Sequence, residues 1–218
     1  MNFALKELGK HEREKAIQIF SEIVPSGFIM KCSREVRESF LVHCLASPLG
    51  YFILALDENI GKGVGYVIAM KNSARFWLNF LLTHSPRISV EIFLNRYQST
   101  KRGDIDRLEG GGNRNFATES AWSPSSNKIG RIFFIGVLPA YRGTGLGVAM
   151  YYHLAQTLKQ EGCTRIEAHI DEGNLASLAL HRKIGYEIRE LQSGYFKAVL
   201  NLENADIKKR FGEKSGMR

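Results

Sequence analysis

Apolar residues recur along the chain with two different periods, one typical of helices and the other of strands. Residues 10–24 and 33–46 place apolar side chains three or four positions apart, which predicts two amphipathic helices. The runs YFILAL, at 51–56, and VGYVIAM, at 64–70, then flank the polar, glycine-bearing DENIGKG. This change of period predicts an antiparallel β-hairpin after the two helices.

The middle of the chain departs from this regular pattern. Residues 74–100 return to helical spacing, and Pro86 is expected to divide them into two inserted helices. Residues 103–128 contain several glycines, few apolar residues and no period, so we expect a long loop, either a functional lid or a disordered segment. Within it, Trp122 is a candidate for stacking on a ligand or for pinning the loop to the surface. A basic tail is expected at 203–218, where Lys208, Lys209 and Arg210 form a short cluster.

Strands and helices alternate from residue 131 onward. A predicted helix at 145–160 connects predicted strands at 131–137 and 165–170, and this order implies a parallel pair joined by a crossover. The remaining predicted elements are, in order, a short helix from near Asn174 to before Gly185 and strands at 186–191 and 195–202.

The segment LPAYRGTGLG, at 138–147, lies between the first of these strands and its helix. Glycines in the first turn of a helix expose backbone N–H groups at the positive end of the helix dipole, where phosphate oxygens bind. The P-loop motif is absent, and the dinucleotide motif G-x-G-x-x-G would need glycine at Val148 or Met150. The pattern that fits is R-x-x-G-x-G, formed by Arg142, Gly145 and Gly147.

Composition narrows the class of protein. The chain has 218 residues, 44% of them apolar and 24% charged, which predicts a single globular domain over residues 1–218. Its three cysteines, Cys32, Cys44 and Cys163, form no C-x-x-C pair, so we expect neither a disulfide framework nor a metal site. The net charge of +8 favours an anionic partner, but no RNA-binding signature or zinc finger points to nucleic acid.

The N-terminal segment and the hydropathy of the chain bear on its location. The first twenty residues carry charges throughout, and no apolar run approaches the roughly 18 residues of a membrane span. We therefore expect a cytoplasmic protein with no membrane or nucleic-acid partner. A homodimer is compatible with the sequence.

Two motifs together resemble those of the GNAT (GCN5-related) N-acetyltransferases. The first is V-L-P-A-Y-R-G-T-G-L-G at 137–147, and the second is N-L-A-S-L-A-L-H-R-K-I-G-Y at 174–186. The resemblance is close over residues 131–190 and looser before them. It implies a mixed α/β (α+β) fold with a centrally splayed β-sheet flanked by helices, here with the inserted helical segment.

The resemblance also implies acetyl-CoA as acyl donor and assigns residues to it. The pantetheine arm would pair with the backbone of strand 131–137, and the pyrophosphate would meet the N–H groups of residues 142–147. Asn174 resembles the asparagine that helps to hold the pantetheine arm, and it is also a candidate helix N-cap. The implied acetyl-CoA residues are Ile135, Gly136, Val137, Arg142, Gly143, Thr144, Gly145, Leu146, Gly147, Asn174 and His181.

Three residues are catalytic candidates. Where the family usually has a tyrosine as general acid, seven residues after the asparagine, this chain has His181, which at its reference pKa would be a poorly protonated acid. His169 lies where some related enzymes carry a glutamate base, and a neutral imidazole could accept the proton of the amine. Glu167 shares a strand face with His169 and could orient or replace it.

Three classes of function follow from these candidates. The first is transfer of an acetyl group from acetyl-CoA directly to the primary amine of a small molecule, and no metal is expected in it. The second is acetylation of a protein or peptide, at an N-terminus or a lysine. The third is a non-catalytic acyl-CoA-binding regulatory module, motivated by the missing tyrosine.

Overall fold

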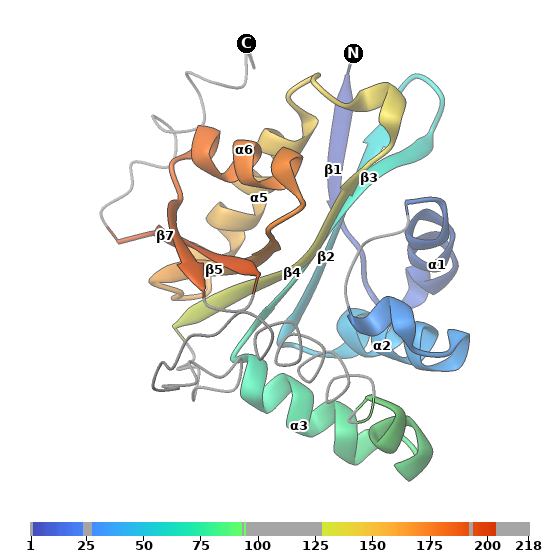
Figure 1. Ribbon diagram of the computed structural model, residues 1–218. Helices are drawn as coiled ribbons and strands as arrows, with labels where there is room; N and C mark the ends of the chain where they lie inside the picture. The colour runs from blue at the N-terminus through green and yellow to red at the C-terminus, as the bar shows by residue number, and fades with distance from the viewer. Residues whose placement is uncertain (1, 24–27, 93, 95–127, 192–193, 204–218) are drawn as a thin grey trace.

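A seven-stranded mixed sheet forms the centre of the molecule (Figure 1). The computed structural model describes residues 2–23, 28–92, 94, 128–191 and 194–203. The strands lie in the order β1-β2-β3-β4-β5-β7-β6, and β4 and β5 pair in parallel while every other neighbouring pair is antiparallel. The strands are β1 (Phe3–Glu7), β2 (Gly50–Asp57), β3 (Lys62–Lys71), β4 (Ile129–Val137), β5 (Arg165–Asp171), β6 (Glu187–Leu191) and β7 (Tyr195–Asn201).

Helices cover the two faces of the sheet as separate layers (Figure 1). One layer is formed by α5 (Leu146–Gln160) and α6 (Leu175–Ile184), whose apolar faces pack on β2 to β7. The other contains α1 (Arg13–Glu22), α2 (Arg34–Ala46) and α3 (Ser73–Thr83). Single turns of 3-10 helix occur at η1 (Lys10–Glu12), η2 (Phe28–Lys31) and η3 (Pro139–Tyr141).

Local sequence explains where several helices begin and end. The Ser33 hydroxyl accepts from the Val36 N–H at the start of α2, and the Asn72 side chain accepts from the Arg75 N–H at the start of α3. Residues 86–92 form a further helix after α3, with Pro86 at its first turn, where a missing N–H is harmless. The predicted split at Pro86 is therefore confirmed.

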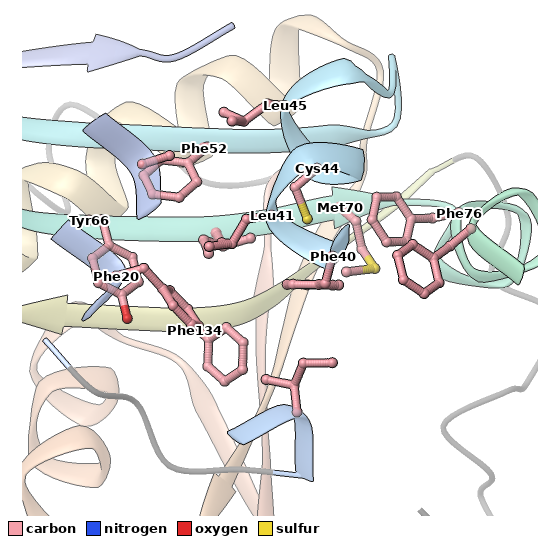
Figure 2. Packing of buried hydrophobic residues seen from close by; sticks show 14 of the residues in the cluster. Phe20, Phe40, Leu41, Cys44, Leu45, Phe52, Tyr66, Met70, Phe76 and Phe134 are labelled. Atoms are coloured by element: carbon pink, nitrogen blue, oxygen red, sulfur yellow. The ribbon is translucent and has the colours of Figure 1, made fainter. Parts of the chain in front are cut away.

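An aromatic core fills the space between the sheet and the layer of α1, α2 and α3 (Figure 2). The Phe40 ring is fully buried and lies 5.6 Å from the Trp77 ring and 5.1 Å from the Phe133 ring, centroid to centroid. The Tyr66 hydroxyl donates to the Ile23 carbonyl at 2.9 Å, so this buried tyrosine has its hydrogen bond.

The parallel ladder between β4 and β5 is short, and this opens the sheet at its centre. Pairing begins at Ile129 with Arg165 and ends at Ile132 with Ala168, although both strands continue beyond those residues. Next to this point β4 has a bulge against β3, where Phe133 is the extra residue between Ile132 and Phe134. The predicted central splay is thus confirmed, and the last parallel rung lies one residue before the bulge.

Most elements predicted from apolar spacing are present within one to three residues of the expected bounds. Strand β1 was not predicted, because its five residues contain two charges and its apolar pattern is too short to identify a strand alone. The predicted loop 103–128, apart from Lys128, and the tail 203–218, apart from Glu203, lie outside the described residues, as does Trp122. In the described ranges, no helix combines the length and apolarity needed to span a bilayer.

Candidate active site

The carboxyl ends of β4 and β5 lie at the same end of the sheet, on the open side of the splay. Residues 138–145 follow β4 there, and residues 172–174 follow β5. Ligands of open parallel sheets bind outside the carboxyl ends of strands, where the connections diverge. The topology therefore brings the two sequence motifs together although they lie about 30 residues apart.

The glycine loop is shaped by two left-handed residues. Gly143 has φ of 79° and Gly145 has φ of 89°, a region that residues with a Cβ rarely adopt. A Cβ on Gly143 would meet no atom within 4 Å, so its surroundings are open. Thr144 Oγ1 donates to the Tyr141 carbonyl at 2.8 Å and Arg142 Nε donates to the Val137 carbonyl at 3.3 Å, which holds the loop against the strand end.

The first turn of α5 presents its backbone N–H groups beside this loop. The first helical bond is donated by Ala149 to the Gly145 carbonyl, so the amides that precede Ala149 in the helix point out of its N-terminus. Leu146 is only 1% exposed, so the backbone that a ligand can reach belongs to Gly143, Thr144, Gly145 and Gly147. The Arg142 N–H donates to the Pro139 carbonyl at 3.2 Å and is already engaged.

Beyond Ile132, β4 pairs with β3 along one edge, while β5 diverges from its other edge. Ile135, Gly136 and Val137 lie in this stretch and are half-buried. Gly136 has no room for a side chain, because a Cβ there would lie 2.5 Å from Ile23 Cγ2. Among the described strands, none pairs with this edge of β4 beyond Ile132, so its backbone can accept an extended ligand as an additional strand.

Asn174 is the N-cap of α6, as its second interpretation predicts. Its side-chain oxygen accepts from the Ser177 N–H at 3.1 Å, and its own N–H donates to the Asp171 carbonyl at 2.9 Å. The side chain is exposed, and the cap does not use its NH₂ group. A contact from this group to a ligand in the splay is compatible with the cap.

His181, predicted as a general acid and an acetyl-CoA residue, is on the side of α6 that faces α5 and is only 1% exposed. Its Nδ1 lies 2.7 Å from the Ser177 carbonyl, which can only accept, so Nδ1 carries the proton. Its Nε2 then accepts from the Tyr151 hydroxyl at 2.7 Å. Burial lowers the pKa of His181 to about 4, so the ring is neutral at physiological pH. This placement disfavours the acid role, because the ring is neutral, sealed and fully engaged.

Tyr151 is the partner that sequence reasoning missed. It is buried in the apolar face of α5, and burial raises the pKa of its phenol well above the usual value. Its ring packs edge-on against His181 and against Tyr186. One feature of the sequence could have identified it: Tyr151 stands among the apolar core positions of the predicted helix. A buried hydroxyl needs a polar partner.

Glu167 and His169 share one face of β5, opposite the layer of α5 and α6, but differ in accessibility. Glu167 is 3% exposed, whereas His169 is exposed. The Glu167 carboxylate lies within ion-pair distance of Arg131, Arg165 and Lys197. His169 lies beyond the last parallel rung and pairs across the sheet with Lys197. Of the two, His169 is the one that a substrate can reach.

Comparison with known proteins identifies the family of this arrangement. Residues 14–186 match the family model described as the acetyltransferase (GNAT) family. A mycothiol acetyltransferase of Salinispora tropica is 38% identical over 64 residues, which are 29% of this chain and 21% of that protein. The chain thus spans about a fifth of the length of this curated relative, and the match is local.

Solved structures share the fold over nearly the whole chain. Arabidopsis thaliana NAA60 in complex with acetyl-CoA superposes with a TM-score of 0.53 and 14% identity, covering 91% of this chain and 96% of that one. A mosquito arylalkylamine N-acetyltransferase like 5b gives a TM-score of 0.57 and 15% identity, covering 92% and 100%. At these identities the likeness is one of fold.

Proposed function

Because the chain belongs to the GNAT family of acetyltransferases, we propose that it transfers the acetyl group of acetyl-CoA directly to the primary amine of a small-molecule acceptor. The observation that carries the proposal is the splay itself. The edge of β4 that diverges from β5 leads directly into a glycine loop and a helix N-terminus. An extended amide arm and a pyrophosphate, covalently linked as in CoA, match these two features in order.

Acetyl-CoA would be held mainly by backbone. We assign its phosphates to the N–H groups of Gly143 to Gly147, since that of Arg142 is engaged within the loop. Its pantetheine amides would pair with Ile135 and Val137, and the exposed NH₂ group of Asn174 would contact the same arm. In this assignment His181 holds α6 against α5 and does not touch the cofactor.

The reaction forms a C–N bond and breaks a C–S bond. The donor enters from the side of α5, so the amine approaches the thioester from the opposite face, on which His169 is exposed. His169 would accept a proton from the incoming ammonium, directly or through water. Backbone N–H groups of the β4 edge would stabilise the carbonyl oxygen as it gains charge, and the leaving thiolate would take a proton from solvent.

Protein or peptide acetylation is the second candidate, supported by the fold likeness to the ribosomal-protein-S18-alanine N-acetyltransferase of Escherichia coli, at 13% identity and a TM-score of 0.53. The small-molecule assignment is supported by the relatives named for mycothiol and arylalkylamine. The charges near His169 also bear on the choice. Three cationic side chains lie within 4 Å of the Glu167 carboxylate, and this local excess of positive charge disfavours strongly cationic acceptors such as lysine-rich peptides.

The test combines calorimetric titration with acetyl-CoA and an assay of thiol release with separate pools of small amines and peptides. The proposal expects binding, and thiol release with at least one amine of the small-molecule pool. Thiol release with peptides alone would instead support protein or peptide acetylation, the second candidate. Binding without release from either pool, or no binding, would contradict the proposal.

A matched pair of glycine variants tests the phosphate site. Gly143 and Gly61 both have positive φ, 79° and 65°, and a Cβ on either would meet no atom within 4 Å. Gly143→Ala and Gly61→Ala therefore introduce the same backbone strain, about 1–2 kcal/mol, in two places. Only Gly143→Ala is expected to weaken acetyl-CoA binding, by about tenfold or more. Equal affinities of the two variants would contradict this placement of the phosphates.

A further inference from the structure

Glu167 lies at the seam where the two halves of the sheet are joined. Its residue pair with Arg131 is the third of the four parallel rungs, and the strands diverge after the fourth. The halves on either side, β1 to β4 and β5 with β7 and β6, are each connected internally by longer antiparallel ladders. The seam is thus a short parallel ladder at the apex of the splay.

The carboxylate contacts a cation on each neighbouring strand. Its Oε2 lies 3.4 Å from Arg131 Nε on β4, and its Oε1 lies 3.7 Å from Lys197 Nζ on β7. On its own strand, Oε1 lies 3.0 Å from Arg165 Nε. The side chains of Arg131 and Lys197 are 13% and 20% exposed, so these attractions are screened little by water. One buried anion therefore connects three strands at the apex.

The same burial separates Glu167 from the reacting amine. At 3% exposure the carboxylate has almost no surface for a substrate to contact, and its cations would repel an incoming ammonium. We propose that Glu167 is a positioning residue, which binds Arg131 and Lys197 and thereby sets the width of the splay in which the thioester lies. This inference rests on the proposed acetyl-CoA site but assigns Glu167 no part in the proton transfer.

Glu167 also acts on the position of His169. The two residues are separated by one position on β5, and Lys197 is the cross-strand neighbour of His169 while it contacts Glu167. Loss of the carboxylate would leave Arg131 and Lys197 without this counter-charge near the apex, and they would move apart or toward solvent. Both the acetyl-CoA edge of β4 and the catalytic candidate on β5 would then shift.

The experiment compares Glu167→Gln with Glu187→Gln, a control that neutralises a 76% exposed carboxylate on β6. Calorimetry measures the Kd for acetyl-CoA, and thiol release measures kcat and KM with the best acceptor found. Glu167→Gln is expected to raise the Kd about tenfold and to lower kcat/KM about 100-fold, because a misplacement of about 1 Å has this effect. The shape of the pH profile is expected to stay the same, and Glu187→Gln is expected to match the wild type.

A double variant separates positioning from chemistry. Arg131→Met combined with Glu167→Gln removes the Arg131 cation together with the carboxylate that it contacts. The double variant is expected to bind acetyl-CoA more tightly than Glu167→Gln does, with a Kd that recovers to within about threefold of the wild-type value. If Glu167→Gln proves too unstable to assay, Lys197→Met keeps the buried pair and is expected to raise the Kd about threefold.

Two results would overturn the inference. One is a Glu167→Gln variant that binds acetyl-CoA like the wild type, whether or not turnover is lost. The other is a raised Kd with no recovery in the double variant. Failure of the wild-type protein to bind acetyl-CoA would instead contradict the proposed function, so the two failures are distinguishable.

Discussion

The two halves of the sheet differ in how their faces are covered. Strands β2 and β3 are buried almost continuously, because helices pack on both of their faces. On one face of strand β5, Ile166, Ala168 and Ile170 are buried. On the other face Arg165, His169 and Asp171 are exposed, and Glu167 is the buried exception. Strand β6 is largely exposed. The N-terminal half is thus a two-sided core, and the C-terminal half combines a packed face with an accessible polar face.

This difference indicates which side chains determine the stability of the fold and which are accessible to a substrate. Side chains of the N-terminal half can be changed only at a large loss of packing. Side chains on the open face of β5 and β7 can change with the acceptor while the core stays intact. Substitutions on the two sides of this division are therefore expected to separate stability from activity, in the order given below.

The largest effect is expected in the aromatic core. Phe40 is fully buried among aromatic rings, and Phe40→Ala should lower the free energy of unfolding by about 3–5 kcal/mol. Urea unfolding followed by circular dichroism measures this loss. Tyr195→Ala, at a 43% exposed residue of the open face, serves as control and should lower it by less than about 1 kcal/mol. Similar losses in the two variants would contradict the expected difference in stability between the aromatic core and the open face.

The second effect is a pH dependence of stability at His181. The folded-state pKa of about 4 is below the ordinary value of 6.5, so the unfolded chain binds more protons between these pH values. Stability from His181 is therefore complete above about pH 6.5 and is lost as the pH falls toward 4. Between about pH 7.5 and about pH 5 this loss amounts to about 2 kcal/mol.

His181→Gln tests this assignment, because its amide can accept from Tyr151 but does not titrate. The fall in unfolding free energy from about pH 7.5 to about pH 5 should be smaller in the variant than in the wild type by about 2 kcal/mol. Equal falls would show that His181 is already protonated or accessible in the folded protein. Acetyl-CoA affinity at the higher pH should change little.

A smaller loss of stability is expected when the Tyr151 hydroxyl, which donates to His181, is removed. Tyr151→Phe keeps the ring and removes the donor to Nε2, so the free energy of unfolding should fall by about 1–2 kcal/mol. The pKa of His181 should stay low, because burial is its main cause. Differential scanning calorimetry measures the loss. Loss of acetyl transfer at unchanged stability would instead place Tyr151 in the reaction.

The smallest effect on stability is expected at His169, with a large effect on activity. His169→Gln should change the free energy of unfolding by less than about 0.5 kcal/mol and lower kcat about 100-fold. The acidic limb of the pH profile, measured by thiol release, reports whether the proton acceptor has changed. An unchanged kcat and an unchanged profile would exclude His169 as the base.

The fold was largely predictable because its signals are local. The strand FFIGV, the glycine loop and helix α5 each follow from period, turn residues and helix-terminus chemistry within about 30 residues. The first strand was not predictable, since Phe3–Glu7 is stabilised as a strand by its pairing with β2, about 50 residues away. The bulge at Phe133 likewise depends on the register between β3 and β4.

Some residues of the candidate site were likewise predictable from the sequence, and others were not. The residues assigned to acetyl-CoA lie in two motifs whose spacing the sequence contains, and the parallel order of β4 and β5 predicts that they meet. The catalytic candidates were less predictable. Glu167 and His169 have the same orientation on one strand, but one is buried among cations and the other is exposed.

The sequence by itself determined the order of the elements after β1 and the glycine loop, because each arises from contacts between neighbours in the chain or from one crossover. The central splay was implied by the resemblance to the GNAT family. Only the tertiary structure decided what the histidines and Glu167 can do. The pKa of His181 depends on burial between two helices, and the environment of Glu167 depends on side chains from three strands. Burial and charge environment are set by residues distant in sequence, so the residue type at one position does not determine them.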